Sequence, residues 1–527
     1  FGDSSALGDD TSGNTNDWAT SGLAAADQMT DTPTNNHCTF NSINTSSSVA
    51  LLDGNLVIDG SGGGAYYPVA GTQAMGSGKW YIEFKQTSSV NVIYGVCNTI
   101  GAAGVTAGVS GIPGDSGSLS DGAGYNLNGT LYEDGSSTAS WGGDPAGDSN
   151  PAATVTAPMV ILCSIWGTAA ASGTMRSAEG DWSYSAPAGF NAINTSNIAA
   201  PTVKDSSEYF QTELYTGNGT AIGSGGKAVT FTGNSSLQPD LVWIKNRDAS
   251  DSHGLYDSVR GTTKQLESDT YAAETTETEG LTTFGSDGFT VGSLDQVNTN
   301  TEDYVAWNWK ESATPGFDIV SYTGNGSNRT ISHSLGAVPK MIAVKMRSGT
   351  YEWTVYHVAV GNTGMLKLNA SEAVSTASSF WQDTTPTSSV FSLGTHGNIN
   401  KNTETFIAYL WAEVEGFSKF GSYTGNNNSD GVFINCGFKP RFLITKKTGS
   451  GNWMQSDTAR NANNPANKIL FPSVTDGEIT GTDYIDFLSN GFKLRHTGGL
   501  NAAVAYIFLA FAENPFGGDG VAPATAR

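Results

Sequence analysis

The sequence predicts an all-β protein of several domains. An N-terminal β-sandwich over residues 1–200 is followed by three tandem β-sandwich modules over 207–312, 317–416 and 417–516, with a tail over 517–527. Three observations carry this prediction. The motif Tyr-Thr-Gly-Asn recurs at wide intervals, strand-like runs recur in step with it, and the 66 glycines and the charged content of 14% disfavour long amphipathic helices.

The Tyr-Thr-Gly-Asn motif begins at Tyr215, Tyr322 and Tyr423, so its copies lie 107 and 101 residues apart. Solenoid repeats extend to about 50 residues, whereas a period of about 100 residues fits a whole small domain. Both Gly and Asn tolerate positive φ. The motif therefore predicts the end of a strand and a hairpin turn near the start of each module.

Downstream of each motif, a proline precedes a short apolar run that ends in a lysine. The runs read PDLVWIK from Pro239, PKMIAVK from Pro339 and PRFLITK from Pro440. A short continuous apolar run is typical of a strand buried on both faces. The lysines Lys245, Lys345 and Lys446 fall in register, and a solvated or salt-bridged strand end is favoured over a binding role for them.

Each module closes with a run in which bulky residues alternate: YVAWNW from Tyr304, FIAYLW from Phe406 and AVAYIF from Ala503. A period of two is typical of a strand with one covered face. Aligned on their alanines, the runs predict that Trp307, Tyr409 and Tyr506 are buried equivalents.

The first 200 residues lack the motif but contain their own strand signals. GKWYIEF at 78–84 and NVIYGVCN at 91–98 are predicted hairpin partners, Asn128-Gly129 predicts a tight hairpin turn, and APMVILCSIWG at 157–167 predicts a buried strand. These runs predict a sandwich of the jelly-roll or concanavalin type. It ends in a Pro-, Ser- and Asn-rich linker near residue 200.

Charge and cysteine content restrict the partners. The formal net charge of −23 and the absence of a Lys/Arg run argue against nucleic acid and against an anionic membrane surface. The apolar stretches are too short to span a bilayer. Cys38, Cys97, Cys163 and Cys436 form no Cys-x-x-Cys pair, and we expect buried thiols. Because the sequence opens at Phe1, we expect an N-terminal portion to be missing or processed.

Two resemblances emerge from these residues. GKWYIEF followed by GYNLNGTLYEDG at 124–135 resembles the SPRY-type, concanavalin-like sandwich. The opening segment, DTPTNNHCTFN at 31–41, PAGFNAINTSNI at 187–198 and the first module together resemble tail-fibre or receptor-binding structural proteins of marine bacteriophages. The resemblance implies a virion component outside the cell that contacts other virion proteins and a host-surface glycan or protein. It also implies a homo-oligomer, namely a trimer.

No motif predicts catalysis. The six histidines show no short metal-ligand spacing. GDSG within 108–118 matches the nucleophile site of trypsin-like proteases but lies in a glycine-rich loop without the structural context of that site. Carboxylates are abundant, yet a glycosidase needs two at a defined separation.

One segment suits a cation. Asp10, Ser12, Asn14 and Asn16 alternate within DDTSGNTND and cluster oxygen ligands of the kind that Ca²⁺ prefers. The alternative, an Asx-rich turn, is favoured because such residues bond to their own backbone. No other cofactor is predicted.

Aromatic residues recur about eight positions past each strand lysine. They are His253 and Tyr256, Trp353 and Tyr356, and Trp453. Aromatic faces beside Asn, Asp and Gln suit glycan binding. A repeated aromatic is nevertheless more often a core residue, and both interpretations stay open.

Two function classes follow. The first is a non-catalytic virion fibre with a host-contacting role. The second is an enzyme, a polysaccharide depolymerase carried on such a fibre, which a clustered carboxylate pair with perturbed pKa in a groove would favour. A secreted bacterial adhesin or lectin is a third interpretation.

Overall fold

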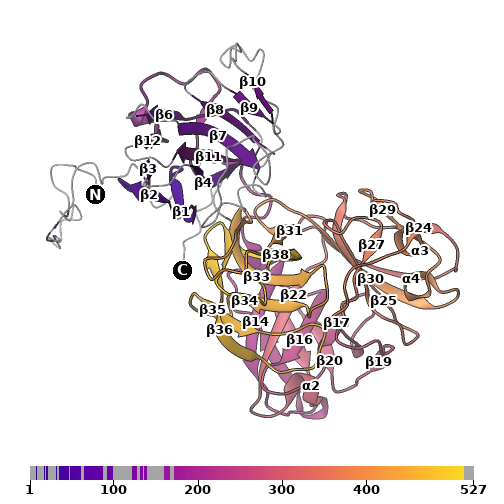
Figure 1. The fold of residues 1–527 in the computed structure, drawn as a ribbon. Helices are drawn as coiled ribbons and strands as arrows, with labels where there is room; N and C mark the ends of the chain where they lie inside the picture. Colours follow the sequence, from indigo (N-terminus) through magenta and orange to yellow (C-terminus); the bar gives the residue numbers. More distant parts are fainter. Residues whose placement is uncertain are drawn as a thin grey trace. The chain divides into compact units, whose positions relative to one another are not determined.

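The computed structural model describes residues 8, 17, 19, 21, 31, 35–46, 48–60, 65–76, 78–86, 92–98, 122–126, 131–133, 136–138, 159–166 and 171–515. Within these ranges the protein is all-β, as predicted, and its helices are single short turns. The chain divides into two compact units, one mainly of residues 1–200 and one mainly of residues 201–516 (Figure 1). None of the helices in these ranges is long and apolar enough to cross a membrane.

The N-terminal unit is a two-layer sandwich. One sheet has the strand order β1-β4-β11-β7-β8-β9-β10, the second has the order β2-β3-β12-β6, and β13 pairs with β5. Ile58 and Met175 of the smaller sheet share a buried core with Val69 and Ile161 of the larger one. The elements are β1 (Phe40–Thr45), β2 (Val49–Leu52), β3 (Val57–Gly60), β4 (Tyr66–Met75), β5 (Trp80–Tyr81), β6 (Glu83–Gln86), β7 (Val92–Asn98), β8 (Gly122–Asn126), β9 (Leu131–Glu133), β10 (Ser136–Thr138), β11 (Met159–Trp166), β12 (Ala171–Arg176), η3 (Glu179–Asp181) and β13 (Asn191–Ala192).

Two of the strand predictions for this unit are confirmed and one is wrong. β11 is buried along nearly its whole length, and β8 pairs with β9 as predicted, while Asn128 and Gly129 lie outside the described residues. The strands from 78–84 and 91–98 are not hairpin partners, because β6 pairs with β12 and β7 pairs with β11 and β8. Phe84 and Tyr94 instead stack with their ring centroids 4.5 Å apart, and both pack against the core that the two sheets share.

Module 1 combines a six-stranded sheet, β14-β22-β16-β17-β18-β19, with a three-stranded sheet, β15-β21-β20. A buried core of its own contains side chains of both sheets, among them Val242 and Phe289. Its elements are η4 (Ser206–Glu208), β14 (Phe210–Thr216), η5 (Ile222–Ser224), β15 (Lys227–Thr230), β16 (Leu241–Asn246), β17 (Gly254–Asp257), β18 (Lys264–Glu267), β19 (Thr275–Thr276), β20 (Leu281–Gly285), β21 (Gly288–Val291), α2 (Asp295–Asn298) and β22 (Asp303–Trp309).

Modules 2 and 3 repeat the central four strands, in the orders β23-β30-β25-β26 and β31-β38-β33-β34. The elements of module 2 are β23 (Phe317–Thr323), β24 (Arg329–Ser332), β25 (Pro339–Met346), β26 (Thr354–His357), β27 (Gly364–Met365), β28 (Ser375–Thr376), α3 (Ser378–Trp381), β29 (Val390–Leu393), α4 (Gly397–Asn400) and β30 (Thr405–Ala412). Those of module 3 are β31 (Ser418–Thr424), β32 (Phe433–Asn435), β33 (Phe438–Lys447), β34 (Met454–Asp457), β35 (Ala466–Ile469), β36 (Ile479–Leu488), β37 (Gly491–Leu494) and β38 (Ala505–Pro515).

The Tyr-Thr-Gly-Asn motif ends the first strand of each module. In module 1 the Tyr215 hydroxyl donates to the Val297 carbonyl at 2.8 Å, and the Asn218 amide donates to Asn298 Oδ1 at 2.8 Å. A Cβ on Gly217 would lie 2.1 Å from the Thr299 carbonyl oxygen, so only glycine fits. The corresponding bonds are Tyr322 to Ile399, Asn325 to Asn400, Tyr423 to Leu500 and Asn426 to Asn501.

The predicted strand end is confirmed, but the predicted hairpin turn is wrong. β14 pairs with β22, whereas the next strand, β15, belongs to the other sheet of module 1. The turn therefore carries the chain from one sheet to the other. Its geometry is fixed by bonds to the segment before β22 and by a local bond, in which Asn218 Oδ1 accepts from the Thr220 amide.

Strand register defines which residues of the modules are equivalent. Thr212 pairs with Trp307, Ile319 with Tyr409, and Phe420 with Leu509. The equivalent of Trp307 and Tyr409 is thus Leu509, and Tyr506 corresponds to Tyr304 and Phe406. The sequence alignment of module 3 was wrong by three residues because Phe508 takes the place of the small Ala306 and Ala408.

The post-proline strand is buried on both faces, as predicted, since every residue of β16 is buried. The closing strand is also buried on both faces, contrary to the prediction of a single covered face. One face of this four-stranded sheet covers the core of its own module. The other face meets the corresponding faces of the other two modules.

Candidate functional site: a closed ring of modules and its polar cleft

The three modules meet around one apolar core, which we call the axial core. Its lining comes from all three modules, and Trp309, Trp411 and Phe511 occupy equivalent positions in it. The Trp309 ring lies 6.4 Å from that of Trp411 and 5.7 Å from that of Phe511, between centroids. The remaining lining residues are Leu241, Trp243, Leu255, Met341, Ala343, Trp353, Leu368, Tyr409, Phe442, Ile444, Trp453 and Leu509.

Three seams surround the axial core: the first between modules 1 and 2, the second between modules 2 and 3, and the third between modules 3 and 1. Each seam has the same backbone hydrogen bond. Its donors and acceptors are Glu274 N to Arg347 O at 2.9 Å, Val374 N to Thr448 O at 2.8 Å, and Glu478 N to Arg247 O at 2.7 Å. Because the third seam returns to module 1, the modules form a closed ring of approximate threefold symmetry.

The recurrent residues at 253, 353 and 453 also bond across the seams. Trp353 Nε1 donates to the Glu267 carbonyl at 2.7 Å, and Trp453 Nε1 donates to the Lys367 carbonyl at 2.8 Å. At the third seam His253 Nε2 lies 3.1 Å from the Phe471 carbonyl. His253 Nδ1 accepts from Trp243, which leaves the proton on Nε2, and burial lowers the pKa of this histidine well below its usual range.

The five aromatic candidates for glycan binding are therefore core residues in the structure. His253, Tyr256, Trp353, Tyr356 and Trp453 are at most 2% exposed. Tyr256 and Tyr356 lie in the cores of their own modules, and the other three join neighbouring modules. None of them presents a ring face at the surface for stacking on a sugar, so the core alternative accounts for their recurrence.

A second set of seam contacts involves the ends of β17, β26 and β34. The Tyr409 hydroxyl donates to Asp257 Oδ2 at 2.6 Å, and Trp307 Nε1 donates to Asp457 Oδ2 at 3.1 Å. His357, at the equivalent position of module 2, approaches the Phe508 carbonyl at 3.1 Å. Because all these groups are buried, the bonds between them specify how the modules pack.

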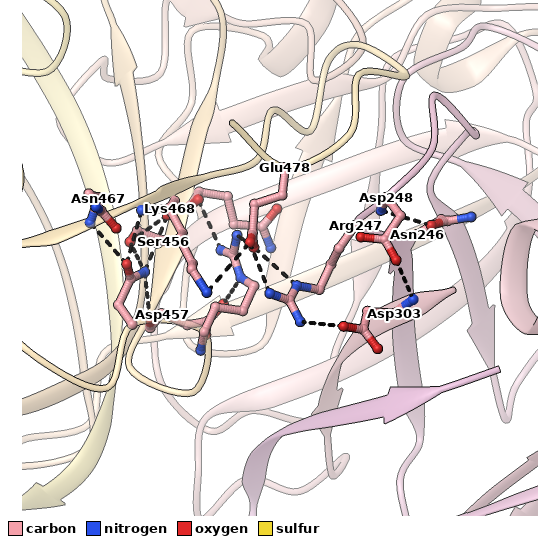
Figure 2. A network of polar contacts seen from close by, with 12 residues as sticks. Asn246, Arg247, Asp248, Asp303, Ser456, Asp457, Asn467, Lys468 and Glu478 are labelled. Atoms are coloured by element: carbon pink, nitrogen blue, oxygen red, sulfur yellow. Dashed lines mark hydrogen bonds and ion pairs between the residues drawn. The ribbon is translucent and has the colours of Figure 1, made fainter. Parts of the chain in front are cut away.

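Ion triads close two of the three seams. At the first, Glu274 lies 3.3 Å from Arg260 and 2.8 Å from Arg347. At the third, Glu478 lies 3.0 Å from Arg460 and 2.9 Å from Arg247. Figure 2 shows Arg247 between Glu478 and Asp303 in this network. The corresponding positions of the second seam hold Val360, Val374 and Thr448, so the seams are equivalent in backbone but not in charge.

The three register lysines are buried, which corrects the prediction of a solvated or salt-bridged strand end. Lys245, Lys345 and Lys446 are at most 1% exposed, and burial lowers the pKa of each to about 8. Each ammonium donates to two backbone carbonyls. Lys245 and Lys446 thereby fix the turns after their own strands, whereas Lys345 reaches a carbonyl of module 1. The acceptors are Asn246 and Ala249, Met346 and Tyr271, and Lys447 and Gly449.

A carboxyl pair lies at the junction of modules 1 and 2. Glu311 shares a hydrogen bond with Asp318, and burial together with this bond raises the pKa of Glu311 to about 7. Asp318 is buried and accepts from the amide and hydroxyl of Ser334. At the junction of modules 2 and 3 the same two positions hold Glu413 and Lys419, an ion pair at 2.8 Å.

A polar cleft of about 210 Å³ opens at the third seam. Ser206, Phe210, Gln211 and Thr212 are buried at its floor, and exposed residues form its rim. The rim and walls comprise Asp205, Ser207, Thr232, Gly233, Asn234, Arg441, Ala512, Glu513 and Asn514. This cleft is the candidate binding site, and sequence reasoning missed it because its residues come from segments more than 200 positions apart.

The cysteines are buried thiols, as the sequence predicted. Burial raises the pKa of Cys97 to about 12 and that of Cys163 well above its usual range. Asp10, Ser12, Asn14 and Asn16, the candidate Ca²⁺ ligands, lie outside the described residues, as does the GDSG segment. Among the described residues, no group of three or more His, Cys, Asp or Glu side chains is arranged to hold a metal ion.

A known family model covers the ring of modules. The model of a domain of unknown function, DUF7483, matches residues 205–515, which is more than half of the chain. The chain belongs to this family. The DUF7483 match begins at the cleft residue Asp205 and ends just after Asn514, so it covers the three modules together. No curated protein matches the chain.

Proposed function

We propose that this DUF7483 protein is a structural component of a bacteriophage particle, a fibre or fibre-associated protein that contacts the host surface. The closed ring of modules is the observation that supports it best. Backbone hydrogen bonds at all three seams and ion triads at two of them hold the three equivalent modules together. The resemblance of the sequence to phage fibre proteins supports the same role, which would place the chain on the virion surface, outside the cell.

The ring also bears on the expected homo-oligomer. Weak binding to a surface becomes effective when a site is multiplied, and three repeated modules supply approximate threefold multiplicity within one chain. A ring of this symmetry fits the axis of a trimeric fibre, with other virion proteins as its partners. Light scattering on the purified chain tests the oligomer, since a trimer and a monomer differ threefold in mass.

Two measurements test the proposed role. Mass spectrometry of purified particles should detect the chain as a virion component. Saturating soluble protein should slow the attachment of the phage to its host, whereas the heat-denatured chain should have no effect. Absence of the chain from purified particles would overturn the structural role, and unchanged attachment would overturn host contact.

A depolymerase carried on the particle is the second candidate, favoured by the carboxyl pair of Glu311 and Asp318. A carboxyl group protonated near neutral pH is suited to act as a general acid. Asp318, however, lies in β23 and Glu311 in the connection before it, and neither residue lines the axial core or the polar cleft. Release of reducing sugar from host polysaccharide, lost in Glu311→Gln, would establish this activity.

A further inference from the structure

We propose that the polar cleft at the third seam binds one neutral polyhydroxylated unit, such as a single hexose. This proposal is based on the geometry of the cleft. It rests on the proposed function only in naming the host surface as the source of the sugar. Its volume of about 210 Å³ lies below the ~300–1,000 Å³ of sites for drug-sized molecules. It therefore suits one small unit and not an extended chain.

Comparison of the three modules at equivalent positions distinguishes this cleft from the other two seams. The position of Thr212 is filled by Ile319 in module 2 and by Phe420 in module 3. At the other two seams the position is apolar, and here it carries a hydroxyl. Thr212 is 3% exposed, and its Oγ1 has no hydrogen-bond partner in the described part of the chain. A buried hydroxyl in this state costs free energy unless a ligand or solvent completes its bond.

The floor of the cleft contains a second buried hydroxyl without a hydrogen-bond partner among the described residues. Ser206 is 2% exposed, and its Oγ also lacks a partner among the described residues. Gln211, between them along the floor, has both amide atoms engaged by backbone groups of Ser207, Gly233 and Ser235. The floor thus offers two hydroxyls that can both donate and accept, which suits the hydroxyls of a sugar.

The charged groups of the cleft already have hydrogen-bond or ion-pair partners within the protein, which favours a neutral ligand over an anion. Glu513 pairs with Lys439 at 3.1 Å and accepts from Thr458 at 2.7 Å. Asp205 accepts from Ser207 and Ser235. Arg441 donates to the Thr212 carbonyl at 3.0 Å, with the Glu513 carboxylate close enough to interact with its charge.

The test uses the full chain and four probes: glucose, galactose, mannose and N-acetylglucosamine, with glucuronate as the charged comparison. Titration calorimetry and saturation-transfer NMR should detect at least one neutral sugar at millimolar concentration. Thr212→Val keeps the shape of the side chain and removes its hydroxyl, so it should weaken binding about three- to tenfold. Thr212→Ile, the residue of module 2, removes the hydroxyl and adds a carbon at the floor, so it should weaken binding more than Thr212→Val does.

Thr330→Ile is the matched control, because it makes the same chemical change at an exposed position of β24. It should leave sugar affinity unchanged. Circular dichroism and thermal unfolding establish that each variant is folded. The proposal is overturned if no neutral sugar binds, if Thr212→Ile binds as well as the wild type, or if glucuronate binds more tightly than every neutral sugar.

The failure of this proposal and that of the proposed function give different results. If soluble protein blocks phage attachment equally well with and without Thr212→Ile, the ring contacts the host but the cleft does not carry that contact. If a neutral sugar binds with the expected response to the variants while attachment is unaffected, the cleft is a sugar site and the host-contact role is wrong.

Discussion

At the residue scale, the third position of the repeated motif is restricted by distance. A Cβ on Gly217, Gly324 or Gly425 would lie 2.1–2.2 Å from a backbone carbonyl oxygen of the segment that leads into the closing strand. The close approach lets the first and last strands of each module converge. Glycine is required here because its neighbour is backbone and cannot rotate away.

We expect Gly324→Ala to lower the free energy of unfolding by about 1–3 kcal/mol, since the added methyl group forces the Lys401 carbonyl to move. Urea denaturation followed by tryptophan fluorescence measures the change. Gly449→Ala is the control, because a Cβ there meets no atom within 4 Å. Equal stability of the two variants would show that the turn has room to relax.

The carboxyl pair makes stability depend on pH. The pKa of Glu311 is raised to about 7, so the folded chain holds this proton more tightly than the unfolded chain does. Its contribution to stability is complete below about pH 4.5 and is lost as the pH rises through about 7. Glu311→Gln, which resembles the protonated form, should therefore gain stability relative to the wild type at pH 8 but not at pH 4.5. Solvent screening limits the gain to the order of 1 kcal/mol.

Glu413→Gln at the equivalent position should behave in the opposite way. It removes an ion pair with Lys419 and so should lower the stability at pH 8 by up to about 1 kcal/mol. Unfolding in urea at the two pH values measures both variants. A gain at pH 8 from both substitutions would contradict the assignment of Glu311 as the proton-sharing member.

At the element scale, the seams determine how the sheets meet. Glu478 is 9% exposed at its side chain and contacts the fully buried Arg460 as well as Arg247. We expect Glu478→Ala to destabilise the ring by about 3–5 kcal/mol, because it leaves a buried guanidinium with less compensation. Thermal unfolding measures the loss.

Glu274→Ala should cause a similar loss at the first seam, where the equivalent triad lies. Glu372→Ala is the control. Its carboxylate pairs with Lys367 but is 62% exposed, so the expected change is below about 1 kcal/mol. Comparable effects of all three substitutions would mean that the triads act as ordinary surface pairs.

The sequence predicted the strands better than it predicted their surroundings. Periodicity located the three post-proline strands, because a run such as that of β16 reflects burial directly. It misplaced the closing strand of module 3, where Phe508 stands opposite Gly421 while Ala408 stands opposite Val320. In module 3 the larger residue of the pair is therefore on the closing strand and the smaller one on the first strand. The total packed volume is preserved, but the alanine used to align the closing strands is absent.

The candidate site could not be predicted from the sequence, for a different reason. The recurrence of His253, Trp353 and Trp453 was visible, but periodicity does not distinguish an aromatic that meets another module from one that meets a ligand. The cleft combines Thr212 with Arg441 and Glu513, which only the closure of the ring brings together. Cross-module contacts leave no local pattern, so neither the axial core nor the cleft could be inferred from the sequence.

At the scale of the whole molecule, the axial core makes the modules depend on one another. A separate module 2 would expose Met341, Trp353, Tyr409 and Trp411, an apolar surface that a soluble domain does not maintain. We expect the fragment 201–516 to unfold in a single cooperative transition, and the fragment 317–416 to be unfolded or aggregated. Circular dichroism and size-exclusion chromatography distinguish these outcomes, and a stable monomeric fragment 317–416 would contradict the shared core.

The closure of the third seam has a consequence for connectivity. Asp205 and Asn514 line the same cleft, and the rings of Phe210 and Phe511 stack 5.2 Å apart, so the chain enters and leaves the ring at one place. A short linker between these ends, with a new opening in the connection between Trp309 and Phe317, should yield a circular permutant that folds to the same ring. The packing of the ring is then compatible with three orders of the modules along the chain, of which this sequence has one. An insertion at any of the three junctions should leave the ring intact.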